Sequence, residues 1–204
     1  PLARALAPQP QVLLLDEPLS ALDVAVRQQL RDEIRRVQQS VGTTTVYVTH
    51  DQSEALAIAD RVALMNHGRI EQLGRPEEVY RAPESLFSAT FVGSRNMLEL
   101  PVVDGRVRLN GAFDVPAPAG SNGRAFALIA PEDVLLTAPG EGLAARISGR
   151  TFHGAITRLT LTAESDGRLI ALTADLPSRV ALGLADESAV GVRVEGDHVR
   201  LFNR

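Results

Sequence analysis

A short apolar run, residues 12–15, ends directly in the acidic pair Asp16-Glu17 and in Pro18. A run in which apolar residues do not alternate with polar ones is typical of a parallel strand that is buried on both faces. Such a strand brings the residues at its carboxyl end to a cleft. The sequence therefore predicts an α/β unit with Asp16 and Glu17 at the open edge of a parallel sheet.

An amphipathic helix and a second strand follow this run. Asp23 is placed to cap the helix, and Gly42 is placed to end it. Its apolar stripe, with spacings of three and four residues, consists of Val26, Leu30, Ile34, Val37 and Val41. Residues 44–49 are rich in β-branched side chains and predict the next strand, which ends at His50. A strand, a helix and a strand in this order suit a parallel sheet.

Smaller elements are expected next. Asp51 and Glu54 are spaced as a capping box for a short helix. The segments 61–65 and 69–73 predict a hairpin, and Pro76 suits the first turn of a further helix.

The composition changes after Asn96, where many short alternating segments begin. The expected strands cover residues 97–103, 106–109, 125–130, 143–147, 155–162, 169–174, 189–194 and 198–202. Asp104-Gly105 and Asp166-Gly167 are hairpin turn signals between such segments. These features predict a small all-β barrel or sandwich. We therefore expect two domains, an α/β part at 1–93 and an all-β part at 94–204.

Composition excludes several classes of function. The chain has no cysteine, which excludes thiolate metal sites and thiol nucleophiles and fits a reducing compartment. All 21 basic residues are arginine, so these 204 residues lack the lysine that a phosphate-binding loop needs. The net charge of −4 argues against a nucleic-acid partner. The arginines at 27, 31, 35 and 36 are interrupted by two acidic residues and predict a solvated helix face.

Several motifs follow one another in a fixed order: residues 13–18, 20–23, 48–51, 60–62 and 68–70. Their order and spacing resemble the C-terminal half of the ATP-binding subunit of ATP-binding cassette (ABC) transporters. Further segments resemble importer ATPases of the maltose, sulfate, ferric-iron and polyamine type, namely residues 74–80, 83, 91–93, 96, 130–134, 154, 176–177 and 182–184. Ala130 stands where these ATPases usually carry an arginine.

This resemblance implies a fold and a set of roles. The fold would be the C-terminal half of a P-loop NTPase (RecA-like) sheet, followed by a small OB-like regulatory barrel. Asp16 would hold Mg²⁺, Glu17 would activate the attacking water, and His50 would contact the γ-phosphate of ATP. Ser20 and Asp23 would belong to the loop that faces the nucleotide. Phosphoryl transfer to water needs such a metal ion, a water-activating group and donors to the phosphate.

The implied function is ATP hydrolysis that drives solute import. The implied partners are a second nucleotide-binding subunit and transmembrane permease subunits, with the protein held at the cytoplasmic face of the membrane. The phosphate loop and the signature sequence of this family precede residue 4 in family order, and Pro1 is not an initiator methionine. We therefore expect a C-terminal fragment whose first 74 residues expose apolar edges.

Two other functions remain open at this point. A non-enzymatic regulatory or ligand-sensing module could be centred on the β domain. A helicase-like or repair ATPase shares the Asp-Glu chemistry, but it does not account for residues 74–80 or for the appended barrel.

Overall fold

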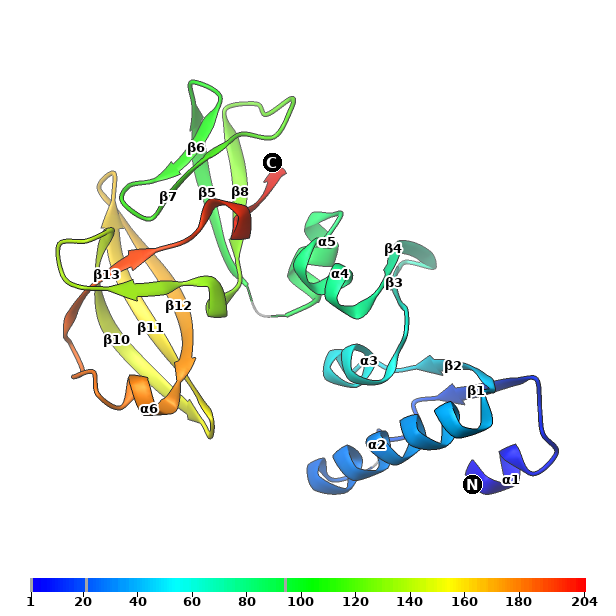
Figure 1. The fold of residues 1–204 in the computed structure, drawn as a ribbon. Coiled ribbons are helices and arrows are strands. Elements are labelled where there is room, and N and C mark those ends of the chain that lie inside the picture. Colours follow the sequence, from blue (N-terminus) through cyan, green and yellow to red (C-terminus); the bar gives the residue numbers. More distant parts are fainter. Residues whose placement is uncertain (1, 21, 94) are drawn as a thin grey trace. The chain divides into compact units, whose positions relative to one another are not determined.

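The computed structural model describes residues 2–20, 22–93 and 95–204, and its contacts divide the chain into two compact units, residues 1–84 and 85–204 (Figure 1). Pro1, Ala21 of the 20–23 motif and Ser94 beside the expected domain boundary lie outside the described residues. The expected domain limits, 1–93 and 94–204, remain a prediction of the sequence.

The first unit is an α/β arrangement. Its elements are α1 (Leu2–Leu6), β1 (Val12–Asp16), α2 (Val24–Val41), β2 (Thr44–Val48), α3 (Gln52–Ile58), β3 (Val62–Asn66), β4 (Arg69–Gly74) and α4 (Pro76–Arg81). Strands β1 and β2 pair in parallel, as predicted, with Asp16 opposite Val48. Strands β3 and β4 form the predicted antiparallel hairpin.

Local capping explains the limits of α2. The Asp23 carboxylate accepts a hydrogen bond of 3.0 Å from the Val26 amide, which satisfies one of the free amides of the first turn. Gly42 ends the helix at a φ of 69°, a left-handed conformation that favours glycine. Both predicted ends of the helix are confirmed.

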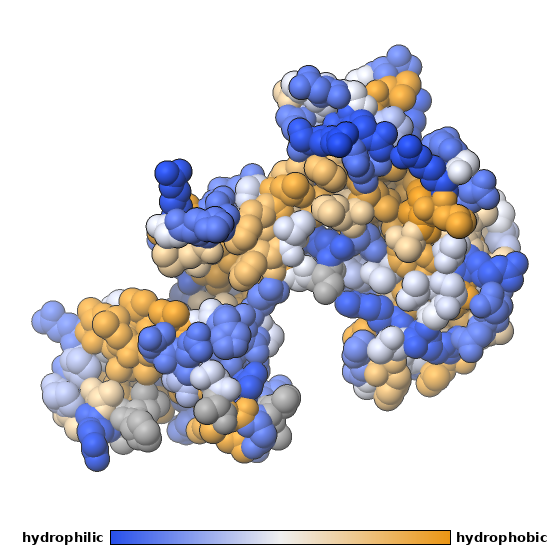
Figure 2. All heavy atoms as spheres, turned by 180° about the vertical axis from the view of Figure 1, so that it is seen from behind, coloured by the Kyte–Doolittle hydropathy of each residue, from blue (hydrophilic) through white to orange (hydrophobic). Residues whose placement is uncertain are grey.

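The burial predicted for β1 is wrong for one of its faces. Leu13 is buried beside Ile34 of α2, but the side chains on the opposite face are largely exposed, Leu14 at 72% and Val12 at 51%. Val46 and Val48 of β2 are exposed at 50% and 51%. Among the described residues β1 and β2 pair only with each other, so the expected open sheet edges are present, and one apolar face of this sheet is exposed in addition. Exposed apolar surface of this kind is orange in Figure 2.

The second unit is almost entirely β-structure. Its elements are α5 (Leu86–Phe91), β5 (Asn96–Val103), β6 (Arg106–Leu109), β7 (Phe113–Pro116), β8 (Arg124–Ile129), β9 (Leu135–Thr137), β10 (Leu143–His153), β11 (Ile156–Ser165), β12 (Arg168–Pro177), α6 (Ser178–Ala181), β13 (Ala189–Arg193) and β14 (Arg200–Asn203). Two short 3₁₀ helices lie at Pro131–Asp133 and Gly196–His198. The all-β prediction is confirmed, although the short strands β7 and β9 were not expected.

Two antiparallel sheets share one apolar core in this unit. Their strand orders are β12-β11-β10-β13-β9 and β14-β8-β5-β6-β7. Buried side chains of both sheets, among them Val107, Ile129, Leu161 and Val192, belong to the same cluster. Hydrophobic contacts that join both sheets into one cluster indicate a single domain core.

Asn96 connects the two sheets. Its amide nitrogen donates to the carbonyl of Thr173 at 2.9 Å, and its oxygen accepts from the Thr173 amide at 2.6 Å and from the Thr173 hydroxyl at 3.0 Å. Asn96 begins β5, whereas Thr173 lies in β12, the edge strand of the other sheet. The side chain therefore takes the place of a neighbouring strand at this edge.

We expect Asn96→Ala to lower the free energy of unfolding of the second unit by about 1–3 kcal/mol, because it leaves the partly buried backbone groups of Thr173 without these partners. Urea denaturation followed by far-UV circular dichroism measures this loss. Asn110→Ala is the matched control, since Asn110 is exposed and makes one hydrogen bond to Asp166. Equal losses in the two variants would contradict the role assigned to Asn96.

Candidate functional site

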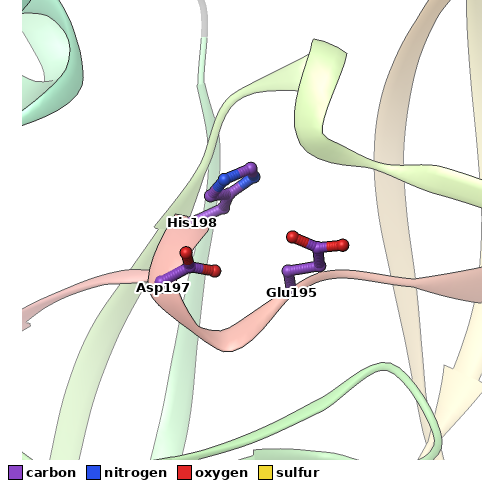
Figure 3. A group of neighbouring side chains, drawn as sticks. All are labelled: Glu195, Asp197 and His198. Atoms are coloured by element: carbon purple, nitrogen blue, oxygen red, sulfur yellow. The ribbon is translucent and has the colours of Figure 1, made fainter.

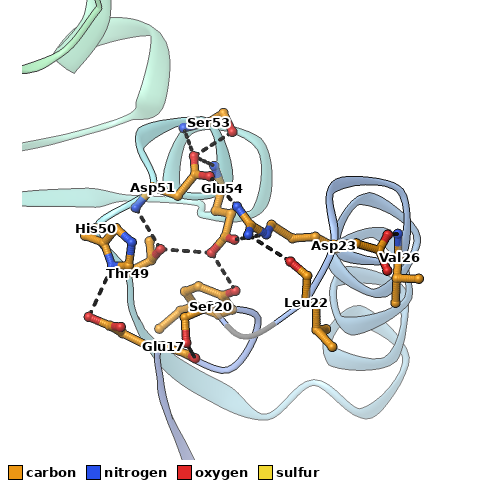
Figure 4. A network of polar contacts seen from close by, with 12 residues as sticks. Glu17, Ser20, Leu22, Asp23, Val26, Thr49, His50, Asp51, Ser53 and Glu54 are labelled. Carbon is orange, nitrogen blue, oxygen red and sulfur yellow. Dashed lines mark hydrogen bonds and ion pairs between the residues drawn. The ribbon is translucent and has the colours of Figure 1, made fainter.

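Glu17 and His50 meet at the carboxyl ends of two parallel strands. Glu17 follows β1 and donates its amide to the carbonyl of Val48, the last residue of β2, at 2.9 Å. Two residues after Val48, the Nδ1 atom of His50 lies 3.2 Å from Oε1 of Glu17 (Figure 4). The side chain of His50 is 74% exposed, and that of Glu17 is 47% exposed. An exposed pair of this kind adds little stability, and both groups are open to a ligand.

The backbone of Glu17 is unusual. Its φ is 42°, in the left-handed backbone region that residues other than glycine rarely adopt. Its carbonyl accepts hydrogen bonds from the amide and the hydroxyl of Ser20, at 3.3 Å and 3.0 Å. A left-handed residue costs roughly 1–2 kcal/mol, and such conformations cluster at functional sites. The turn after β1 therefore holds the Glu17 carboxylate at the strand ends, and the left-handed backbone at Glu17 lowers the stability of the fold slightly.

Asp16 has a chemistry that suits Mg²⁺. It is the last residue of β1 and is exposed. Within residues 2–20, 22–93 and 95–204, its carboxylate makes no hydrogen bond or ion pair. Mg²⁺ prefers oxygen ligands and commonly uses one or two carboxylates while keeping several waters. The free Asp16 carboxylate, adjacent in sequence to Glu17, therefore fits the metal role that the family resemblance implies.

The side chains of Ser20 and Asp23 both form hydrogen bonds with backbone groups of the same chain. The Ser20 hydroxyl donates to the carbonyl of Glu17, which places it beside the Glu17–His50 pair. The carboxylate of Asp23 is the helix cap described above. The structure thus brings Glu17, Ser20 and His50 together, and it places Asp23 at the start of α2.

Asp51 confirms one half of the predicted capping box, and Glu54 does not form the other half. Asp51 accepts from the amides of Ser53 and Glu54, at 2.8 Å and 3.3 Å. The hydrogen bond from the Ser53 hydroxyl is the main cause that lowers the pKa of Asp51. The Glu54 carboxylate instead turns inward and accepts from the hydroxyls of Tyr47 and Thr49, at 3.0 Å and 2.8 Å. Burial, followed by the contact with Glu54, raises the pKa of Tyr47.

Arg27 belongs to the same polar cluster. Its guanidinium donates to the Leu22 carbonyl at 2.9 Å and to the Asp51 carboxylate at 3.3 Å, and its Nε lies 3.8 Å from Glu54. The expected solvated arginine face is therefore wrong for Arg27, whereas Arg35 forms an exposed ion pair with Asp60.

The sequence held one signal for this cluster. Tyr47 and Thr49 stand two residues apart in and after β2, so they share a face. Two hydroxyl groups on a strand face that packs against helices need polar partners inside the protein. That need could have directed attention to Glu54 and Arg27.

A second polar group lies in the β unit. Ligand atoms of Glu195, Asp197 and His198 lie within 4.8 Å of one another in one turn (Figure 3). Nδ1 of His198 is 2.9 Å from the carboxylate of Asp133. The two residues belong to different 3₁₀ helices, so this contact ties the two turns together.

No helix in the described part of the chain has the length and apolar character needed to cross a bilayer.

Comparison with known proteins identifies relatives over most of the chain. Residues 127–202 match the TOBE domain family. A sulfate/thiosulfate import ATP-binding protein of Caulobacter vibrioides is 49% identical over 173 residues, which cover 85% of this chain and 50% of the relative. Such a protein of Chromobacterium violaceum is 42% identical over 207 residues, which cover 98% of this chain and 57% of the relative.

Polyamine importers are also among the relatives. A spermidine/putrescine import ATP-binding protein of Pseudomonas aeruginosa is 39% identical over 207 residues, 96% of this chain and 55% of the relative. A solved structure of a cytoplasmic molybdate-binding protein aligns with 53% of this chain and 96% of its own chain, at 16% identity and a TM-score of 0.39.

The chain spans about half the length of the curated relatives it matches. The chain is thus a homologue, over most of its length, of the ATP-binding proteins of sulfate/thiosulfate and spermidine/putrescine import, and it carries a TOBE domain.

Proposed function

We propose that the chain is the C-terminal part of an ABC importer subunit that hydrolyses ATP to drive solute import. The observation that carries this proposal is the Glu17–His50 pair at the carboxyl ends of two parallel strands. Homology to import ATP-binding proteins supports it. The chain's own length, about half that of its relatives, and its lack of lysine support a fragment that does not contain the phosphate loop.

In this proposal each residue at the strand ends has one task. Glu17 polarises the attacking water, an effect typically worth about 10²- to 10⁴-fold in rate. His50 would donate a hydrogen bond to the γ-phosphate, and Asp16 would hold Mg²⁺. When bound, Mg²⁺ neutralises charge on the phosphates. Ser20 and Asp23 shape the loop that faces the nucleotide.

The proposed partners follow from this role. A second nucleotide-binding subunit would complete the ATP site in a homodimer, and transmembrane permease subunits would hold the protein at the cytoplasmic face of the membrane. Relatives named for sulfate and for polyamines both match over most of the chain. The proposal therefore covers import and leaves the solute open.

We expect these 204 residues alone to show no binding of Mg-ATP stronger than about 1 mM and no phosphate release. The backbone amides of a phosphate loop and its lysine supply most of the grip on a triphosphate, and this chain contains no lysine. Isothermal titration calorimetry and a phosphate-release assay measure both properties, with the full-length Caulobacter vibrioides relative as the positive control. Micromolar binding together with phosphate release would contradict the fragment proposal.

A further inference from the structure

Glu54 is a buried carboxylate that the proposed chemistry does not use. Its side chain is 5% exposed, and it accepts hydrogen bonds from Tyr47 and Thr49 while Arg27 lies 3.8 Å away. Burial of an ionised group costs several kcal/mol unless opposite charge and hydrogen bonds compensate. Three partners around one carboxylate meet that condition, so this part of the unit is held in one arrangement.

Arg27 connects this carboxylate to two loops. One guanidinium nitrogen donates to the carbonyl of Leu22, which lies in the loop between Ser20 and Asp23. The other donates to Asp51, the residue that follows His50 in the sequence. Arginine can bridge two acceptors because its donors form a rigid planar fork. A single side chain of α2 therefore ties the turn after β1 to the turn after β2.

Both neighbours of His50 are fixed by the same group of residues. The Thr49 hydroxyl donates to Glu54 and accepts from the Asp51 amide at 3.0 Å. Asp51 is held in addition by Arg27. The His50 imidazole is 74% exposed, so surrounding side chains do little to orient it. Its backbone, held on both sides, sets where its Cβ atom lies relative to Glu17, and so which rotamers bring the imidazole to Glu17.

We propose that Arg27 and Glu54 are positioning residues that hold the two turns as one unit, so that His50 stays opposite Glu17. This inference rests on the proposed ATPase function for its consequence in catalysis. The geometric part concerns the Glu17–His50 pair, which is present in the chain without nucleotide.

Arg35 provides a matched control on the same helix. It is an arginine of α2 with 26% of its side chain exposed, against 29% for Arg27, and it forms an ion pair with Asp60. Asp60 follows α3 in the sequence and belongs to neither turn. If the Glu17–His50 contact were weakened merely because an ion pair of α2 is disturbed, Arg27→Lys and Arg35→Lys should weaken it alike.

The first experiment records the imidazole ¹⁵N shifts of His50 by NMR in the 204-residue chain. The shift difference between the chain and its Glu17→Gln variant defines the signature of the Glu17–His50 pair. We expect Arg27→Lys and Glu54→Gln to remove at least half of that difference, whereas Arg35→Lys keeps it. Full retention of the signature in Arg27→Lys and Glu54→Gln would overturn the proposal.

Thr49→Val keeps the test decisive if either variant fails to fold. Valine has the shape of threonine, but it removes the hydroxyl that links Glu54 to the Asp51 amide. We expect the Asp51 amide to exchange with solvent at least about tenfold faster in Thr49→Val, with loss of the His50 signature. An unchanged signature in a folded Thr49→Val chain would contradict positioning through this hydroxyl.

The second experiment uses the full-length protein that carries this chain. We expect Arg27→Lys to lower kcat about 10- to 100-fold with KM for ATP changed less than about twofold, because misplacement of a catalytic group acts on the transition state. Arg35→Lys should leave both constants near the wild type. If Glu17→Gln abolishes hydrolysis but Arg27→Lys behaves as Arg35→Lys does, the positioning role fails and the ATPase proposal stands. If Glu17→Gln leaves hydrolysis intact, the role of Glu17 fails. If the unchanged full-length protein releases no phosphate from ATP, the ATPase proposal itself fails.

Discussion

Glu17→Gln in the full-length protein should reduce ATP turnover by about 10²- to 10⁴-fold while ATP binding is preserved. Glutamine keeps the size of the side chain and can still accept a hydrogen bond from His50, but it cannot polarise the attacking water as an anion. The loss should therefore fall on kcat and spare nucleotide affinity. Single-turnover phosphate release and a fluorescent-nucleotide titration measure the two quantities separately.

Asp16→Asn is the companion variant, because it neutralises a carboxylate next to Glu17 with a different proposed task. Loss of the proposed Mg²⁺ ligand should weaken metal-dependent ATP binding as well as the rate. A Glu17→Gln protein whose phosphate release stays within about threefold of the wild type would show that Glu17 does not activate the water, since a general base is worth far more.

The strand–helix–strand order of the first unit could be read from the sequence because each element has its own local signal. Asp23 and Gly42 have side-chain and backbone properties that set helix ends regardless of what packs around them. Burial could not be predicted in this way. An apolar run such as residues 12–15 indicates a strand that is able to be buried on two faces. Whether each face is buried depends on other elements that pack against it, and the run does not identify them.

The same contrast holds for the candidate site. Glu17 and His50 follow two strands that were expected to be parallel, so their meeting at one sheet edge follows from the pattern. The contacts of Arg27 with Leu22 and Asp51 depend on how α2 lies against two turns. The spacing of the arginines by itself gives no sign of such tertiary contacts, and the arginine series was accordingly predicted as a solvated face.

The β unit shows a further limit, at strands too short to carry a periodic pattern. β9 has three residues, Leu135–Thr137, and its pairing depends on β13, more than fifty residues later. The pairing requires a close approach of the loop after β9, and Gly191 of β13 allows it. A Cβ atom at Gly191 would lie 1.7 Å from the Glu141 carbonyl oxygen and 2.3 Å from Oγ1 of Thr137.

We therefore expect Gly191→Ala to destabilise the second unit by about 3 kcal/mol or more, because overpacking against backbone forces the loop or the strand to move. Gly149→Ala is the matched control in the same sheet, since its Cβ would meet only Thr160 at 3.6 Å, an ordinary contact. That variant should stay within about 1 kcal/mol of the wild type. Urea denaturation followed by far-UV circular dichroism reports the loss.

Tyrosine fluorescence separates this loss from a general one. The chain has no tryptophan, and its two tyrosines, Tyr47 and Tyr80, both lie in the first unit. Their fluorescence should therefore follow unfolding of the first unit only, and Gly191→Ala should leave that transition in place while the β-sheet signal is lost at lower urea. If Gly191→Ala unfolds at the same urea concentration as Gly149→Ala, the loop does not press on Gly191 in solution. If both transitions move together, the two units unfold as one cooperative block, and the effect of the glycine extends beyond the β unit.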